Sequence, residues 1–249
     1  MQRMCSTIPR LRAALAVLLI GSATAHADLI RPRTSRSFPD IAGDVVGSQT
    51  YTFDPASKTG TFQVVNAPQF LALGPKGSEM IDVQPDQDGT LEQTLNLKLD
   101  QNGKLIEAPG NRFQLYGTVT IRGQLYRGLL LEGTPTAFGA QPVQEGSMGP
   151  SGVFDLNMKI TGGQLAQAFG SDVYFRVIAQ SNSTFQGSFA TDFSGDRPMT
   201  NLRALQGRLP APVPEPAPLI VFVAATGGFA WLRRRARRTV RRPGPLSPP

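Results

Sequence analysis

Cysteine, histidine and tryptophan are almost absent from this 249-residue chain, since each occurs once. Cys5 and His26 both lie in the first 27 residues, which read as a removable leader. Without that segment the chain has no thiol and no imidazole. This composition excludes disulfides, cysteine nucleophiles, Ser-His-Asp triads and zinc sites built on Cys or His.

An excess of positive charge is missing from the body of the chain, although the whole chain has a formal net charge of +7. Residues 28–211 contain 15 Lys and Arg against 17 Asp and Glu, a net charge of −2. The surplus arginines lie near the two ends. The body therefore has no basic field that would attract nucleic acid, and we expect no nucleic-acid partner.

Residues 1–27 have the three parts of a secretory signal peptide. A basic start precedes a short apolar run over residues 13–20, and Ala25 and Ala27 form a small-x-small cleavage site for signal peptidase. The alternative is an uncleaved anchor, but a membrane-spanning helix needs about 20 apolar residues. The pattern predicts export and removal of this segment.

A second apolar run, residues 217–232, contains no charged residue. As a helix it would be about 24 Å long, shorter than the ~30 Å hydrocarbon core, but snorkelling arginines and local thinning can compensate. Trp231 ends the run at the expected interface. An arginine cluster follows within residues 233–249 and predicts a cytoplasmic tail by the positive-inside rule: Arg233, Arg234, Arg235, Arg237 and Arg238. We expect one short C-terminal transmembrane helix with the body outside.

The segment before this run, residues 203–216, is a proline-rich linker, and alternating prolines make it extended. It ends in the motif Val213, Pro214, Glu215 and Pro216. The order of this motif, a short apolar run and arginines resembles the PEP-CTERM sorting signal of Gram-negative bacteria. The resemblance covers residues 213–238 and implies exosortase as a processing partner, with a link to exopolysaccharide and biofilm. It implies nothing about the body, because sorted proteins carry many unrelated domains.

The body divides into a polar leader, residues 28–47, and a domain of short strands, residues 48–202. Polar and apolar residues alternate along several stretches, such as residues 49–53, 60–65, 90–99 and 153–162. Residues 112–133 form a hairpin pattern around Gly123, residues 104–108, 173–180 and 183–193 read as further strands, and residues 164–169 as one short helix. About ten strands with turn residues between them predict an all-β antiparallel sandwich or barrel.

Two similar turn sequences, DQDG at residues 86–89 and DQNG at 100–103, raise the question of calcium. Asp86, Asp88 and Asp100 are weak metal candidates because calcium prefers oxygen ligands. Their spacing does not match an EF-hand loop, in which Gly occupies the sixth position. Hairpin turns explain the two sequences better, since Asp-Gly and Asn-Gly favour positive φ. We therefore predict no metal ion and no cofactor.

Two other site chemistries are open to a chain without Cys and His. A glycosidase needs a placed pair of carboxylates, and its candidates are Glu92, Glu107, Glu132 and Asp155. A glycan-binding surface would use exposed aromatic rings, and the tyrosines of the body are Tyr51, Tyr116, Tyr126 and Tyr174. Phenylalanines fit a core better, namely Phe154, Phe175, Phe185, Phe189 and Phe193.

The sequence as a whole predicts a non-enzymatic, exported protein of the cell envelope, surface or extracellular matrix. Its partners would be signal peptidase, exosortase, the membrane and an exopolysaccharide. Two alternatives to this interpretation remain for the body. One is a glycan-binding module, and the other is a periplasmic domain held by a single-pass anchor.

Overall fold

The computed structural model describes residues 29–30, 38–75, 79–143 and 151–205. They belong to one compact unit, except that residues 122–124, the turn of one hairpin, are assigned to a second unit. The elements are β1 (Asp40–Asp54), β2 (Thr59–Ala72), β3 (Met80–Asp82), β4 (Glu92–Asp100), β5 (Arg112–Ile121), β6 (Gln124–Val143), β7 (Ser151–Gly162), α1 (Ala166–Phe169), β8 (Asp172–Ser181) and β9 (Phe193–Ala204).

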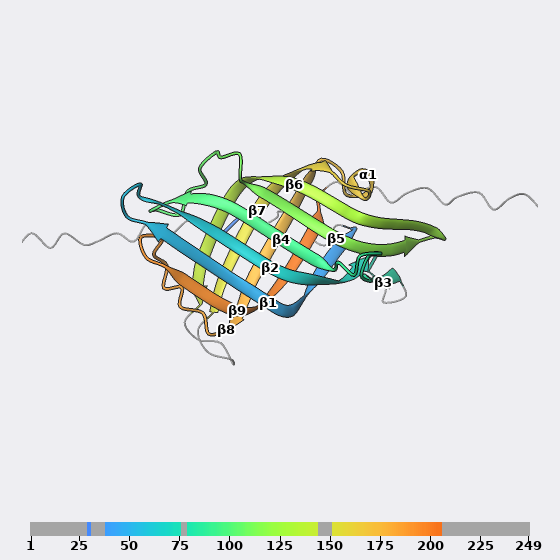
Figure 1. Cartoon of the computed structure of the whole chain (residues 1–249), viewed down its shortest axis with the longest axis horizontal. Helices are drawn as coiled ribbons and strands as arrows, with labels where there is room; N and C mark the ends of the chain where they lie inside the picture. Colours follow the sequence, from blue (N-terminus) through green and yellow to red (C-terminus); the bar gives the residue numbers. More distant parts are fainter. Residues whose placement is uncertain (1–28, 31–37, 76–78, 144–150, 206–249) are drawn as a thin grey trace, which may run out of the picture. The chain divides into compact units, whose positions relative to one another are not determined.

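The strands form a closed antiparallel β-barrel of eight strands (Figure 1). Their order around the wall is β1-β9-β8-β7-β6-β5-β4-β2, and β2 pairs again with β1. The short strand β3 adds to the side of β2. Closure depends on β1, because this strand pairs with β2 on one side and with the last strand, β9, on the other.

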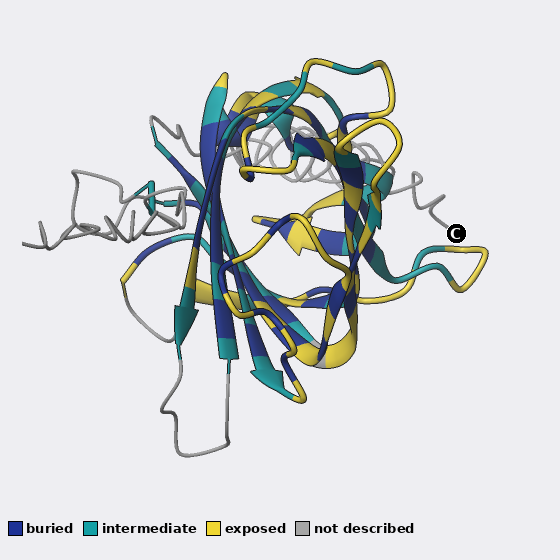
Figure 2. Ribbon diagram, turned by 90° about the vertical axis from the view of Figure 1, so that its left-hand side faces the viewer, coloured by how far each residue is buried: buried dark blue, intermediate teal, exposed yellow. Residues whose placement is uncertain are grey.

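Alternation along the strands separates a packed interior from an outer wall, as Figure 2 shows by colour. In β2, Phe62 and Val64 are buried, while Thr61 and Gln63 are exposed. The same period of two places Leu95, Leu97 and Leu99 of β4 inside, together with residues from every other wall strand. Successive side chains of a strand point to opposite faces, so this pattern fixes which residues can reach solvent.

Both ends of the barrel are filled by side chains. Residues 182–192, which follow β8, fold inward and bring Phe185 and Phe189 against Phe193 and Tyr51. The Tyr51 hydroxyl donates a hydrogen bond of 2.9 Å to the carbonyl of Phe189. The helix α1 precedes β8 and therefore lies at the other end of that strand, where Phe169 is fully buried.

The predicted all-β class is confirmed, and the architecture is the barrel rather than the sandwich. The hairpin around Gly123 is β5–β6, and the expected short helix is α1. Three local expectations were wrong. Residues 40–47, expected in the polar leader, are part of β1; residues 104–108 form only an isolated bridge between Leu105 and Leu99; residues 183–192 are a loop whose phenylalanines enter the core.

Strand β9 explains the last error. Its buried residues include Thr200, Leu202 and Ala204, which lie beyond the phenylalanine-rich segment that looked like the last strand. Phe185 and Phe189 are inside because the loop turns back over the barrel end, not because the segment is extended. A loop whose aromatic rings are buried can have the same hydrophobic pattern as a strand. This pattern does not show whether the backbone pairs with a neighbouring strand.

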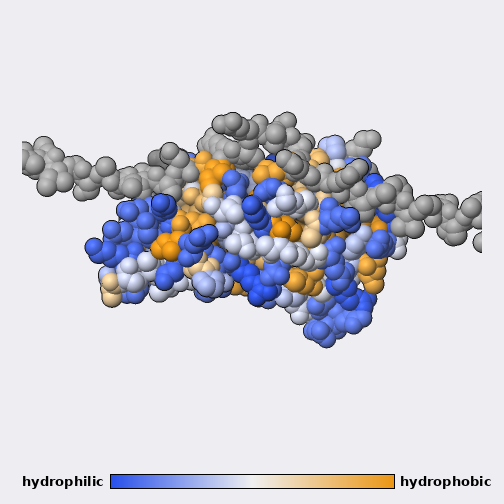
Figure 3. All heavy atoms as spheres, turned by 90° about the horizontal axis from the view of Figure 1, so that it is seen from above, coloured by the Kyte–Doolittle hydropathy of each residue, from blue (hydrophilic) through white to orange (hydrophobic). Residues whose placement is uncertain are grey.

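On the face shown in Figure 3, hydrophobic residues form separate patches among hydrophilic ones. No helix within the described residues is both long and apolar enough to cross a membrane.

Candidate functional site

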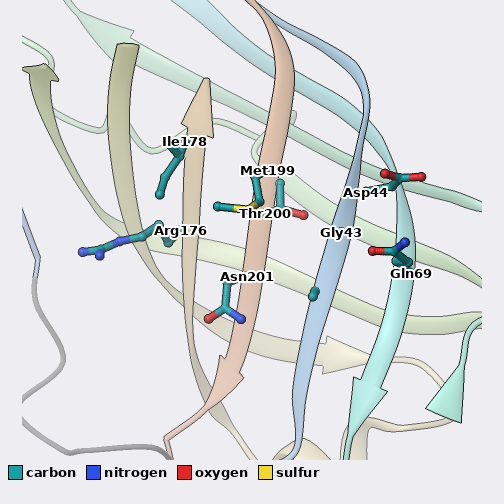
Figure 4. Close-up of a pocket in the computed structure, with 9 residues that line it drawn as sticks. Gly43, Asp44, Gln69, Arg176, Ile178, Met199, Thr200 and Asn201 are labelled. Atoms are coloured by element: carbon teal, nitrogen blue, oxygen red, sulfur yellow. The ribbon is translucent and has the colours of Figure 1, made fainter. Parts of the chain in front are cut away.

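A hollow of about 270 Å³ lies on the wall over β8, β9, β1 and β2. Figure 4 shows side chains from all four strands around it. Arg176, Ile178, Met199 and Asn201 alternate with core residues of their strands and so belong to the outer face. The remaining lining residues are Ala42, Gly43, Asp44, Gln69 and Thr200. The hollow is the clearest concave feature in this part of the wall, and we treat it as the candidate site.

The hollow exists because β1 bulges away from its neighbours. Gly43 pairs with Thr200 of β9, and the next pair is Ser48 with Asp196, so β1 has one residue more than β9 over this interval. On the other side, the pairing with β2 also shifts between residues 43 and 47. A bulge leaves part of the ladder unpaired and redirects the neighbouring side chains. Residues 44–46 therefore open a gap in the wall.

Buried amide groups fill the inner side of this gap. Asn66 Nδ2 donates to Thr200 Oγ1 at 2.9 Å and to the carbonyl oxygens of Asp44 and Pro198 at 3.2 Å each. Gln93 Nε2 donates to Asn66 Oδ1 at 2.9 Å and to Thr200 Oγ1 at 2.8 Å. Side-chain amides thus replace the missing strand-to-strand hydrogen bonds.

The hydroxyl of Thr200 is oriented by this network. Its oxygen accepts hydrogen bonds from both Asn66 and Gln93, which occupies its two lone pairs. Thr200 is 1% exposed and pairs with the core residue Val177, so its hydroxyl faces the interior of the barrel and belongs to this network.

The close fit around Thr200 requires glycine on β1. A Cβ atom at Gly43 would overlap Thr200 Oγ1 and Asn66 Nδ2. Gly47 has φ of +149° and a Cβ there would overlap the carbonyl oxygen of Val65. The two glycines that bound the bulge are therefore both needed for the backbone and the amide network to approach each other.

The charged residues beside the hollow are paired. Arg176 Nε and Nη2 donate to the two carboxylate oxygens of Asp155 at 2.7 and 2.9 Å, and the Asp155 side chain is fully buried while Arg176 is 33% exposed. The hydrogen bond with Asp155 raises the pKa of Arg176. The guanidinium also lies 5.6 Å from the Tyr174 ring centre. Burial, followed by the Asp155 carboxylate, raises the pKa of the Tyr174 hydroxyl.

A second ion pair lies along the same strands. Arg203 donates to Asp40 Oδ2 at 3.1 and 3.2 Å, and Asn201 Nδ2 donates to Asp40 Oδ1. Burial raises the pKa of Asp40, and the charge of Arg203 opposes that rise. With its amide nitrogen held by Asp40, Asn201 keeps its oxygen as an acceptor. The rim of the hollow therefore carries positioned polar groups and no unpaired arginine among the residues named here.

Several unusual features occur on or next to the β1 bulge. Gln49 is fully buried, and neither atom of its amide has a partner among the described residues; the same is true of Gln93 Oε1. Val46 and Met199 are 67% and 40% exposed. Buried amides without partners lower stability. Of these four residues Met199 lines the hollow, whereas Gln49, Gln93 and Val46 do not.

No family model, curated protein or solved structure matches this chain. The site is therefore interpreted from its own geometry.

The weak metal candidates do not come together. The carboxylate of Asp86 accepts backbone N–H groups of Asp88 and Thr90, and that of Asp100 accepts those of Asn102 and Lys104. The two turns lie at opposite ends of the nine-residue strand β4, roughly 30 Å apart at about 3.3 Å per residue. Among the described residues no group of three or more potential metal-ligating side chains occurs.

The candidate carboxylates of a glycosidase are also separate. Glu132 pairs with Arg112, and Asp155 is bound in both oxygens by Arg176. Of the tyrosines considered for sugar stacking, Tyr51 and Tyr174 are buried, while Tyr116 and Tyr126 are half-buried. The five phenylalanines expected in the core are buried there, as predicted.

The sorting and membrane residues lie outside the described residues. These are Ala25 and Ala27 of the leader, the motif Val213 to Pro216, the apolar run 217–232, and the arginines from 233 to 238. They remain predictions from the sequence.

Sequence reasoning missed the amide network and the hollow. Gln93 carried a readable signal, because it lies in register with Leu91, Leu95 and Leu97, where an apolar residue is expected. A polar residue on the buried face of a strand indicates a partner inside. Asn66, Thr200 and Arg176 gave no such signal, because their partners come from distant strands.

Proposed function

We propose that this chain is an exported, non-enzymatic protein of the cell surface or extracellular matrix, sorted by a PEP-CTERM type signal. The observation that carries the proposal is the order of the C-terminal features: Pro-Glu-Pro, an uncharged run of 16 residues, then clustered arginines. The N-terminal leader supports the same topology independently, because both segments put the body outside the cytoplasm.

The barrel supports an interaction role rather than catalysis. Its interior is packed with side chains and both ends are filled, so a partner has to meet the outer wall. The mature body would lack Cys and His. We therefore place its function in binding to a component of the envelope or matrix, linked to exopolysaccharide and biofilm by the resemblance of the sorting signal.

A glycan-binding module is a second candidate function, and the hollow over β8, β9, β1 and β2 is the observation that favours it. It combines the exposed amide of Gln69 and the Asn201 oxygen with an apolar floor from Met199 and Ile178. Ligand sites typically pair apolar lining with a few placed polar groups. This candidate is compatible with sorting, because it concerns the body and not the tail.

Mass spectrometry of the C-terminus tests the sorting proposal. The full chain is expressed in a Gram-negative host with an exosortase and in the same host without it, and each cell fraction is analysed. We expect a terminus near residues 213–216 in the extracellular fraction, only when exosortase is present. The double change Pro214→Ala with Pro216→Ala should abolish this processing.

The matched control lies in the same linker. Pro210→Ala with Pro212→Ala removes as many prolines but leaves the motif intact, so processing should continue. An intact arginine tail in the inner membrane of the exosortase-positive host would overturn sorting and favour the single-pass anchor.

A further inference from the structure

We propose that the hollow at the β1 bulge binds one uncharged sugar ring, through Asn201, Gln69 and Arg176 around a floor of Met199 and Ile178. The proposal deepens the proposed function and rests on it only in placing the barrel outside the cell, where polysaccharide is available. The binding chemistry itself is argued from the residues of the wall.

The wall at the hollow departs from regular strand pairing. An uninterrupted pairing of β1 with β9 would satisfy the backbone without help from side chains. Instead, two glycines, a buried Asn-Gln-Thr network and an exposed Met199 occur at one place. Bulges are frequent next to functional sites because they redirect side chains. Here the bulge lies beside the outward-facing residues Met199 and Asn201, which line the hollow.

The volume of the hollow limits the size of its ligand. Pockets for drug-sized molecules enclose about 300–1,000 Å³, and this hollow has about 270 Å³. It therefore accommodates a single ring or side chain rather than a large cofactor. One unit of a longer chain also fits this geometry, because the hollow lies on the wall and its neighbours would continue over the surface.

The charged residues beside the hollow limit the charge of its ligand. Both oxygens of Asp155 are bound by Arg176, and Asp40 is bound by Arg203 and Asn201. Of the charged residues that line the hollow, Arg176 and Asp44, neither is without a partner, so an ionic ligand would lose hydration without gaining a free counter-charge. An uncharged ligand has no such cost. The pairing therefore favours neutral over acidic or basic ligands.

The polar groups at the hollow include both hydrogen-bond donors and acceptors. Arg176 uses Nε and Nη2 for Asp155, which leaves Nη1 as a donor. Asn201 Oδ1 is an acceptor, and the Gln69 amide supplies one donor group and one acceptor. Hydroxyl groups both donate and accept, so a ring with several of them matches this mixture. Its C–H face would pack on Met199 and Ile178.

Binding is tested with the full-length chain, purified in a detergent whose headgroup is not a sugar. The probes are neutral oligosaccharides of glucose, galactose, mannose and N-acetylglucosamine, with oligogalacturonate as an acidic comparison, followed by saturation-transfer NMR. At least one neutral probe should bind with a Kd of about 1 mM or tighter. Gln69→Ala and Met199→Ala should each weaken it about 3–10-fold, the range of one hydrogen bond or a small apolar contact.

Two matched controls are available on the same barrel. Gln63→Ala changes an exposed glutamine of the same strand, six positions from Gln69, and Met80→Ala changes an exposed methionine of β3. Both should leave the Kd unchanged. The proposal is overturned if no neutral probe binds, if oligogalacturonate binds more tightly, or if the controls weaken binding as much as the hollow variants.

Sedimentation velocity tests whether a second copy of the chain binds to the same surface. A dimer that Met199→Ala dissociates would assign the hollow to a second copy of the chain and would also overturn the sugar proposal. These readouts are independent of the C-terminal mass, so failure of binding and failure of sorting are distinguishable.

Discussion

Asn66 shows how much one side chain can determine in this barrel. Its amide bridges β1 and β9 at the point where their own pairing stops, through Thr200 Oγ1 and the carbonyl oxygens of Asp44 and Pro198. Because Gln93 holds the Asn66 oxygen, the amide cannot rotate without breaking several bonds. These bonds connect β1, β2, β4 and β9 at the place where the register of β1 shifts, although Gln93 Oε1 has no partner among the described residues. The network therefore holds the wall together across the register shift.

Tyr51 gives a prediction at the same scale. Burial first, and the nearby Asp100 and Asp192 carboxylates second, raise the pKa of Tyr51 to about 12, from 10.0 in an unfolded chain. Between these values the folded state binds more protons than the unfolded state, so the free energy of unfolding falls as the pH rises. Tyr51→Phe cannot titrate, but it loses the bond to Phe189, which costs about 1 kcal/mol at neutral pH.

The difference in unfolding free energy between Tyr51→Phe and the unchanged chain should therefore shrink from pH 10 to pH 12. Urea titrations followed by circular dichroism measure it. Phe193→Leu is the control, because Phe193 stacks on Tyr51 at 4.7 Å but has no titrating group. Its deficit should stay constant with pH. A constant deficit for Tyr51→Phe as well would contradict the burial argument.

At the scale of the element, β1 is two strand segments joined by a bulge. Residues 40–43 and 48–51 pair on both sides, residues 52–54 continue the pairing with β2, and the register shifts between residues 43 and 48. The sequence of this strand shows the reason, since Gly43 and Gly47 bound the interruption. The glycines allow close approach of the amide network, and Val46 between them is 67% exposed.

Gly43→Ala tests the role of the bulge. The added methyl group overlaps Thr200 Oγ1 and Asn66 Nδ2, so the network or the strand has to shift. We expect a loss of about 2–4 kcal/mol in the free energy of unfolding, the range for overpacking combined with disturbed buried hydrogen bonds. Urea unfolding at neutral pH gives the value.

Gly110→Ala serves as the comparison. A Cβ atom there meets no atom within 4 Å, and surface substitutions usually change stability by about 0.5 kcal/mol or less. Equal stability of the two variants would mean that the bulge relaxes freely, and the argument that it is a built feature would fail.

For the whole molecule, the decisive contact joins the two ends of the barrel sequence. Strand β1 begins at Asp40 and β9 ends at Ala204, and their pairing closes the wall. The other neighbouring pairs of the wall join strands that are consecutive along the chain, except β2 with β4, which are separated by the short strand β3. Closure removes free sheet edges, which otherwise invite association with another chain. It also makes the barrel depend on its longest-range pairing.

A disulfide between positions 50 and 194 tests closure. Thr50 and Ser194 are register partners and both are exposed. The backbone N–H and C=O of Ser194 bond to Thr184, so they point away from β1 and leave a non-hydrogen-bonded pair. Cα atoms in such a pair are about 4.5 Å apart, within the range of disulfides.

In a Cys5→Ser background, Thr50→Cys with Ser194→Cys should oxidise readily and without loss of the native spectrum. Linking a loop of about 145 residues should raise the free energy of unfolding by up to about 5 kcal/mol relative to the reduced form. Free-thiol counting and urea unfolding, each with and without reductant, measure the two effects. Cysteines that remain reduced, or a bond that destroys the fold, would contradict the closure of β1 on β9.

The all-β class could be predicted from the sequence, because alternation of period two is a local property that a strand such as residues 90–99 displays alone. The hairpin at Gly123 and a short helix within residues 164–169 could also be predicted, since they depend on neighbouring residues, and the helix in the structure is residues 166–169. The same local patterns predict the leader and the C-terminal sorting segment.

Three features follow from long-range contacts: the closure of the strands into a barrel, the filling of one end by residues 183–192, and the meeting of Asn66, Gln93 and Thr200. Each of these depends on which strands become neighbours, and alternation is identical for a sandwich and for a barrel. Asn66 and Thr200 are 134 positions apart. The hollow lies between strands that are brought together by closure, so no local pattern could contain it.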